Sequence, residues 1–149
     1  MGENDVVDLP DTGPLLGIDP GTRRIGVAVS DAGRTIALPL EVVDRHAGDW
    51  LRRLADLARE REVAGIVVGL PARLDGSEGP EAAEARKLAA LLSRTLGVPA
   101  VLADERFTSA AANRAMAAAD VDSRRRRPLV DKVAAALMLQ GWLDAAGRA

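Results

Sequence analysis

The chain has 149 residues and a formal net charge of -2, so it suits a single domain and has no overall attraction for polyanions. Apolar residues make up 48% of the sequence but aromatic residues only 2%, so Ala, Val and Leu must fill the core. Cysteine is absent and there is one histidine, which excludes disulfides, thiolate metal sites and sites built from several histidines. A bound metal would therefore need oxygen ligands, which Mg²⁺ and Mn²⁺ prefer.

The beginning of the chain is polar. Residues 1–13 include Pro10 and Gly13, and we expect a flexible tail followed by one domain over residues 14–149. No apolar run approaches the ~20 residues that cross a bilayer, and the acidic start does not resemble a signal peptide. We expect a cytoplasmic protein with no membrane partner.

Three short apolar runs follow the tail and predict three consecutive strands, at residues 15–19, 25–30 and 36–43. A Pro-Gly turn after Asp19 and a second turn around Gly33 separate them. Strands joined by tight turns form an antiparallel meander. The first strand is expected to be central, because later strands must also join this sheet.

The apolar period then changes from two to that of a helix. Residues 50–58 predict a helix, 63–68 a strand buried on both faces, 80–96 a helix that ends at Gly97, and 98–103 a fifth strand. Helices preceding the fourth and fifth strands favour parallel pairing through right-handed crossovers.

The last third of the chain predicts two further helices. Thr108 or Ser109 can cap a short Ala-rich helix, residues 124–128 form a polar break, and residues 130–145 form the final helix. The order βββ-α-β-α-β-α-α predicts an α/β fold with a five-stranded mixed sheet and helices on both faces.

Two acids stand at the ends of predicted strands. A carboxylate is costly to bury unless it is paired or bound to a metal. Asp19 ends the expected central strand, although an Asp before Pro-Gly also commonly starts a turn. Glu105 follows the fifth strand, at the edge where active sites of α/β sheets collect. It could equally be a loop acid, and the adjacent Asp104 is a rival for the same role.

A third acid, Asp131, begins a helix that is apolar all round and therefore largely buried. At helical spacing it shares a face with Ala134, Ala135, Met138 and Trp142, so its carboxylate is expected to point toward the core. The alternative is an acid that favours a helix N-terminus through the macrodipole.

Asp19, Glu105 and Asp131 can converge at one edge of the sheet. Three carboxylates without His or Cys suit two Mg²⁺ or Mn²⁺ ions about 4 Å apart, which can activate water and stabilise a phosphate under attack. These three residues are therefore predicted as catalytic residues and metal ligands of a phosphodiester-cleaving enzyme.

Hydroxyl and guanidinium groups stand near these acids and could hold phosphates. A run of four arginines directly precedes the last helix, where it could contact RNA or form an ordinary solvated loop. The predicted nucleic-acid ligands are Thr22, Arg23, Arg24, Arg106, Arg124, Arg125, Arg126 and Arg127. For Gly17, Gly21 and Gly26 near the first turn, hairpin geometry is favoured over close approach of an RNA backbone.

Five ordered motifs resemble the YqgF (RuvX) family and together cover about residues 15–145. They are Leu-Gly-Ile-Asp-Pro-Gly-Thr-Arg-Arg-Ile-Gly-Val-Ala-Val-Ser at 16–30, Val-Gly-Leu-Pro at 68–71, Asp-Gly at 75–76, Asp-Glu-Arg-Phe-Thr-Ser at 104–109 and Val-Asp-Lys-Val-Ala-Ala at 130–135. Each motif is weak by itself, whereas the ordered set is specific. Pro20 is a departure, because many relatives carry Phe or Val there.

The resemblance implies a ribonuclease H-like fold and a hydrolase that processes the 5′ end of pre-16S ribosomal RNA during ribosome biogenesis. It also implies that Asp19, Glu105 and Asp131 are the family's three acids. Expected partners are pre-16S rRNA and pre-ribosomal particles, with the protein a monomer or weak homodimer.

Three other functions stay open. One is a Holliday junction-resolving DNA endonuclease, a role earlier proposed for the family by analogy with RuvC. Another is an actin-like ATP-binding module, because Asp19-Pro-Gly-Thr resembles a phosphate motif of those proteins. The last is a ribosome-assembly factor without catalytic activity.

Overall fold

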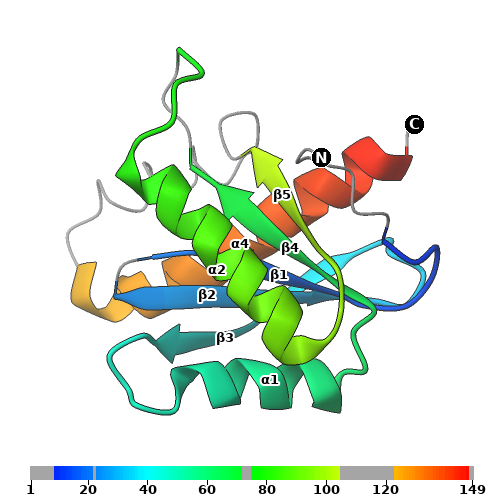
Figure 1. Ribbon diagram of the computed structural model, residues 1–149, viewed down its shortest axis with the longest axis horizontal. Helices are drawn as coiled ribbons and strands as arrows, with labels where there is room; N and C mark the ends of the chain where they lie inside the picture. Colours follow the sequence, from blue (N-terminus) through cyan, green and yellow to red (C-terminus); the bar gives the residue numbers. More distant parts are fainter. Residues whose placement is uncertain (1–8, 22, 72–74, 105–122, 148–149) are drawn as a thin grey trace.

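The computed structural model describes residues 9–21, 23–71, 75–104 and 123–147. Figure 1 shows strands β1 to β5 surrounded by helices. The elements are β1 (Leu15–Asp19), β2 (Arg24–Ser30), β3 (Ala37–Asp44), α1 (Trp50–Glu60), β4 (Gly65–Leu70), α2 (Pro80–Leu96), β5 (Ala100–Asp104) and α4 (Ser123–Gly147).

The five strands form one mixed sheet in the order β3-β2-β1-β4-β5. The pairs β1–β2 and β2–β3 are antiparallel, whereas β1–β4 and β4–β5 are parallel. This arrangement confirms the predicted meander, the predicted crossovers and the central place of β1. Because β1, β4 and β5 run the same way, their carboxyl ends meet at one edge of the sheet, where Ile18 is aligned with Val68 and Val68 with Leu102.

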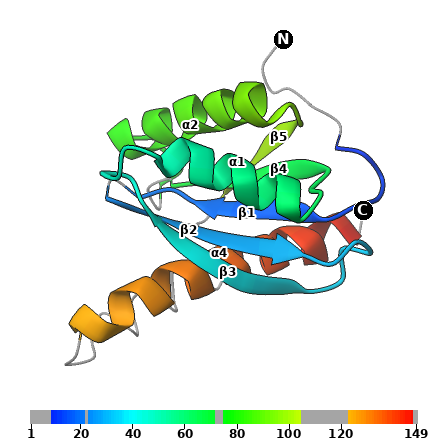
Figure 2. The same cartoon turned by 90° about the horizontal axis from the view of Figure 1, so that it is seen from below.

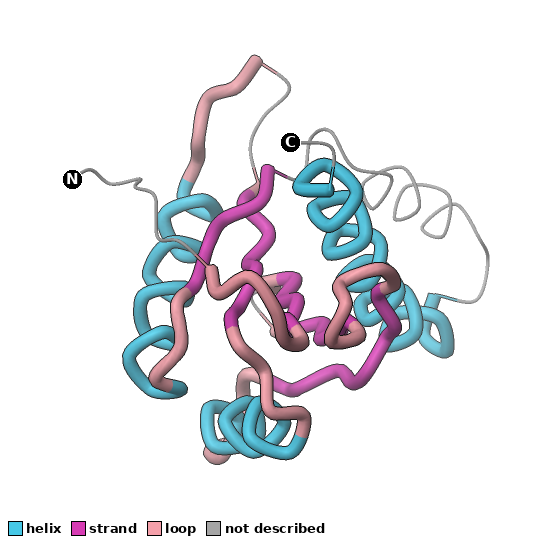
Figure 3. The backbone as a smooth tube through the Cα atoms, turned by 90° about the vertical axis from the view of Figure 1, so that its right-hand side faces the viewer, coloured by secondary structure: helices cyan, strands magenta, loops and turns pink. Residues whose placement is uncertain are grey.

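Helices cover both faces of the sheet. Figure 2 shows α1 and α2 on one side of the strands and α4 on the other, and Figure 3 shows the strands in magenta between the helices. Side chains of β1 alternate between the two layers: Leu16 and Ile18 join the core under α1 and α2, whereas Leu15 joins the core under α4. The sheet thus separates two apolar cores and supports both.

The helix α4 begins earlier than the sequence predicted. It runs from Ser123, so the arginines at 124–127 and Pro128 belong to the helix, and the predicted polar break is wrong. Arginine is a good helix former, so the four arginines favour this longer helix, although Pro128 at its sixth position cannot donate a backbone hydrogen bond. In Figure 2 the first turns of α4, in orange, extend past the sheet at the end where Asp19 lies.

The described part of the predicted tail is held against the domain. Leu9 packs against the core under α4, and Arg34 donates hydrogen bonds to the carbonyl oxygens of Gly13 and Thr12. Residues 1–8 and the expected helix at Thr108 or Ser109 lie outside the described residues. Among the described helices, none combines the length and apolar character needed to cross a lipid bilayer.

Candidate active site

Asp19 is the last residue of β1, at the carboxyl edge of the sheet, and only 7% of its surface is exposed. Alternation along β1 assigns it to the same face as Gly17, where α4 packs. A Cβ on Gly17 would lie 2.9 Å from the Cβ of Leu139, so glycine lets the helix come close. Asp19 is therefore a buried acid on the α4 side of the central strand.

Asp131 reaches the same place from α4. In the register of the sheet, Asp19 lies directly opposite Gly26 of β2. A Cβ on Gly26 would collide with the backbone carbonyl of Asp131. The backbone of Asp131 in α4 therefore packs directly on Gly26. Since paired Cα atoms in antiparallel strands lie about 5 Å apart, the two acids are neighbours across Gly26.

The carboxylate of Asp131 forms an ion pair with the guanidinium of Arg24. Arg24 Nε donates a hydrogen bond of 2.8 Å to Asp131 Oδ2, and the two side chains are 30% and 25% exposed. Arg24 lies two residues from Gly26 on the same face of β2. The predicted nucleic-acid ligand Arg24 is thus engaged with a predicted metal ligand, 107 residues away in sequence.

The position of Asp131 within α4 shows whether it is a sheet-facing acid or an acid placed at the helix N-terminus. Asp131 stands eight residues after Ser123, where the helix begins, whereas the influence of the macrodipole is confined to the first turn. Ala134, Ala135 and Met138 are fully buried on the sheet, as their spacing predicted. Asp131 therefore belongs to the sheet-facing side of a helix interior.

Asp104, the rival of Glu105, lies on the opposite face of the sheet from Asp19. Its neighbour Ala103 belongs to the core under α4, whereas Leu102 packs on the side of α1 and α2. Asp104 acts electrostatically on the ion pair of Glu78 with Arg86 of α2. The hydrogen bond from Arg86 lowers the pKa of the Glu78 carboxyl, and the negative charge of Asp104 partly opposes this shift. Asp104 therefore lies on the α2 side of the sheet and not beside Asp131.

Several predicted site residues fall outside the described part of the chain, namely Glu105, Thr22 and Arg106. For the arginines at 124–127, the structure gives the backbone, which lies on the part of α4 that extends past the sheet. Arg23 is exposed in the turn between β1 and β2.

The sequence did not single out Arg45, which the structure brings to this edge. It follows β3, donates through Nη1 to the carbonyl oxygen of Gly21 at 3.2 Å, and its Cζ lies 5.3 Å from the centre of the Trp50 ring. No carboxylate among the described residues forms an ion pair with it. Its position depends on the pairing of β3 with β2, so local sequence carries no signal for it.

The glycines near the first turn have two different roles. A Cβ on Gly21 would collide with the carbonyl oxygen of Arg24, which agrees with the favoured hairpin interpretation. Gly17 and Gly26 instead make room for α4, a reason that the sequence interpretation did not include. Both are required because the helix crosses the strands at very short range.

The donor set suits a hard divalent ion. Asp19 and Asp131 lie on either side of Gly26 and both carry carboxylate oxygens, which are the ligands that Mg²⁺ and Mn²⁺ prefer. Within the described ranges, no group of three or more His, Cys, Asp or Glu side chains is arranged as a metal site. The structure therefore brings together two of the three predicted acids.

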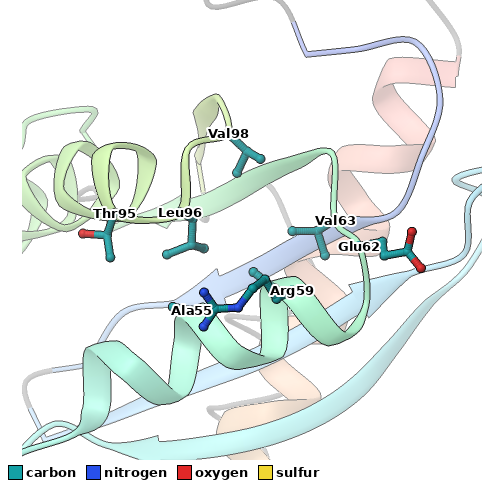
Figure 4. Close-up of a pocket in the computed structure, with 8 residues that line it drawn as sticks. Ala55, Arg59, Glu62, Val63, Thr95, Leu96 and Val98 are labelled. Carbon is teal, nitrogen blue, oxygen red and sulfur yellow. The ribbon is translucent and has the colours of Figure 1, made fainter.

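A cavity of about 290 Å³ lies elsewhere in the molecule. Figure 4 shows its lining side chains between α1 and the end of α2, including Arg59, Val63 and Val98. Val63 and Val98 precede the parallel strands β4 and β5, whereas Asp19 ends β1. The cavity is thus at the opposite end of the sheet from the acids.

Comparison with protein families gives one match over most of the chain. Residues 13–145 match the model of a family described as RuvX, Holliday junction resolvase. A protein of Rhodobacter capsulatus named "Putative pre-16S rRNA nuclease" is 48% identical over 139 residues, covering 91% of this chain and 86% of that protein. A protein of Myxococcus xanthus with the same name is 48% identical over 132 residues, covering 87% of each chain.

Comparison with solved structures gives the fold. RuvC of Thermus thermophilus in complex with a Holliday junction substrate superposes with a TM-score of 0.56 at 18% identity, covering 92% of this chain and 98% of that one. A second RuvC structure from Thermus thermophilus gives a TM-score of 0.55 at 18% identity. These matches confirm the predicted ribonuclease H-like fold.

Proposed function

Because this chain belongs to the RuvX family, we propose that it is a nuclease that hydrolyses phosphodiester bonds of pre-16S rRNA, in the processing of its 5′ end. The observation that carries the chemistry is the contact of α4 with β2, where Asp131 rests on Gly26 opposite the buried Asp19. Two carboxylates gathered from residues 112 positions apart, in a chain without cysteine, suit oxygen-bound metal catalysis.

Asp19, Glu105 and Asp131 form the proposed catalytic set. Asp104 faces away from Asp19, so we assign the third acid to Glu105, the next residue in the sequence. Asp19 and Asp131 would hold Mg²⁺ or Mn²⁺, and a pair of such ions supplies activation of water and stabilisation of the charged phosphate. Asp19 is buried under α4, with 7% of its surface exposed, which limits the freedom of its side chain.

Basic groups around these acids are the proposed contacts to the nucleic-acid backbone. Arg23 is exposed in the turn that follows Asp19, and Arg45 is held near the same turn by Gly21 and Trp50. The arginines at 124–127 begin the helix that carries Asp131, and Thr22 and Arg106 remain candidates by sequence. Positive groups placed this way attract phosphates locally although the net charge of the chain is -2.

We propose that the protein acts in the cytoplasm on pre-16S rRNA, with pre-ribosomal particles as partners, as a monomer or a weak homodimer. The alternative, a junction-resolving DNA endonuclease, is retained because the family description names that activity. A symmetric junction cut requires two active sites and hence a dimer.

The test compares cleavage of a precursor rRNA fragment that carries the 5′ extension of 16S rRNA, with Mn²⁺ present. The substitutions Asp19→Asn and Asp131→Asn should each lower the rate by roughly 10²-fold or more, because losing one group that supports transition-state charge stabilisation typically costs a factor of this size. Asp56→Asn, which changes an exposed acid paired with Arg59 on α1, should leave the rate unchanged.

Two outcomes would contradict the proposal. Wild-type rates in Asp131→Asn would remove this residue from the catalytic set. Symmetric cutting of a four-way DNA junction, without cleavage of the rRNA fragment by the same preparation, would favour the resolvase alternative.

A further inference from the structure

The ion pair between Arg24 and Asp131 has a consequence for metal binding at the proposed site. The hydrogen bond from Arg24 Nε to Asp131 Oδ2 is 2.8 Å long and joins β2 to α4. Both side chains are partly buried, at 30% and 25% exposure, so water screens the pair less than it would an exposed one. One carboxylate oxygen of Asp131, a proposed metal ligand, thus accepts a hydrogen bond from the positively charged Arg24.

The surroundings explain why a cation is needed there. Asp19 is 7% exposed and lies across Gly26 from Asp131, so two acids are gathered on one face of the sheet under α4. Negative charges gathered where water is partly excluded repel each other more than they would at an exposed surface. The guanidinium of Arg24 offsets part of this repulsion while holding Asp131 in place.

We propose that Arg24 acts as a built-in substitute for the metal, neutralising Asp131 until a divalent ion displaces its guanidinium. The proposal rests on the function proposed above, in which Asp131 binds the ion. It changes the role predicted for Arg24 from the sequence, because a guanidinium engaged with Asp131 is not available to a phosphate in the metal-free protein. Displacement would release Arg24 toward the substrate when the metal has bound, so metal loading and phosphate binding would be coupled.

Calorimetric titration of the full-length protein with Mn²⁺ tests this proposal without relying on activity. If Arg24 competes with the metal, Arg24→Gln should bind Mn²⁺ more tightly by roughly tenfold or more, the factor for loss of one charge-assisted hydrogen bond. The same variant should melt at a lower temperature without metal and gain more stability when Mn²⁺ is added, because repulsion between Asp19 and Asp131 is no longer offset.

Arg23→Gln is the matched control. It removes the same charge from the neighbouring, exposed position, where the side chain forms no ion pair with the described residues. Arg24→Lys keeps the charge but loses the planar donor, and it should raise the Mn²⁺ affinity by a smaller factor than Arg24→Gln. Arg24→Lys also provides the test of the proposal if Arg24→Gln fails to fold.

Three outcomes would overturn the proposal. Unchanged or weaker Mn²⁺ binding in both Arg24 variants would show that Arg24 does not compete with the metal. An equal gain in Arg23→Gln would trace the effect to the general field of positive charge. Absence of Mn²⁺ binding by the wild-type protein would overturn this inference and the metal-dependent function together, whereas the first two results leave that function intact.

Discussion

At the scale of single residues, three arginines near Asp19 look alike in sequence but differ in their surroundings. Arg24 donates to Asp131, Arg23 is exposed in a turn, and Arg45 lies over the ring of Trp50. A guanidinium that is oriented by an aromatic ring and a carbonyl oxygen loses less entropy when it binds a phosphate. Arg45 is therefore the best-positioned phosphate contact among the three.

Replacing Arg45 should weaken nucleic-acid binding. We expect Arg45→Ala to lower the affinity for a precursor rRNA fragment several-fold and to reduce the slope of log affinity against log salt by about 0.7, the value for one phosphate contact in single-stranded nucleic acid. Fluorescence anisotropy in Ca²⁺ or without metal measures this directly and avoids cleavage. Arg61→Ala removes an exposed arginine beyond the other end of α1 and should have little effect. Equal losses in both variants would argue against a specific role of Arg45.

At the scale of elements, the decisive contact is that of α4 with β1 and β2. The helix comes close enough for Leu139 to touch the backbone of Gly17 and for the Asp131 carbonyl to rest on Gly26. Glycine at these two strand positions would ordinarily weaken a strand. Here the absence of a side chain allows a helix residue to approach Asp19, so the small residues of the strands position the acid of the helix.

Adding a methyl group should therefore push the helix away from the sheet. We expect Gly17→Ala to destabilise the protein by roughly 1–3 kcal/mol, the usual cost of overpacking, and Gly26→Ala to cost at least as much because its methyl group would meet backbone. Urea denaturation gives the stability, and Mn²⁺ titration of the folded protein should show weaker binding as Asp131 moves. Gly48→Ala adds a methyl group with nothing within 4 Å and serves as the control. Unchanged metal affinity in a folded Gly26→Ala variant would contradict the positioning role.

The helix α4 also shows where sequence patterns were insufficient. Its apolar face and the burial of Ala134 and Met138 followed from helical spacing. Its start did not, because four arginines and a proline are typical both of a solvated break and of the first turns of a helix.

At the scale of the whole molecule, the sheet is shared by two apolar cores. Trp50 packs against the core under α1 and α2, and Trp142 against the core under α4. Strands such as β1 and β4 are buried on both faces, so neither layer can separate without exposing the same strands to water. The two layers should therefore unfold together.

The two tryptophans of the chain make this expectation measurable. Trp142→Phe leaves Trp50 as the only reporter of one layer, and Trp50→Phe leaves Trp142 as the reporter of the other. We expect each variant to show the same urea midpoint by fluorescence as by circular dichroism, as a two-state transition requires. An earlier fluorescence transition at Trp142 than the loss of helical signal would show that the α4 layer unfolds independently.

The sequence by itself determined the mixed sheet, the central place of β1 and the burial of β4 on both faces. An apolar period of two or 3.6 residues is a property of a short stretch of sequence, so it predicts strands and helices without knowledge of how distant segments pack. It also indicated that any bound metal would have oxygen ligands, and the ordered motifs indicated the family. Tertiary structure alone decided that Arg24 binds Asp131, that Arg45 reaches the turn beside Asp19, and that Gly17 and Gly26 make room for α4. These are contacts between segments far apart in the chain, 107 residues in the case of Arg24 and Asp131, and such contacts arise only from the packing of a helix on a sheet.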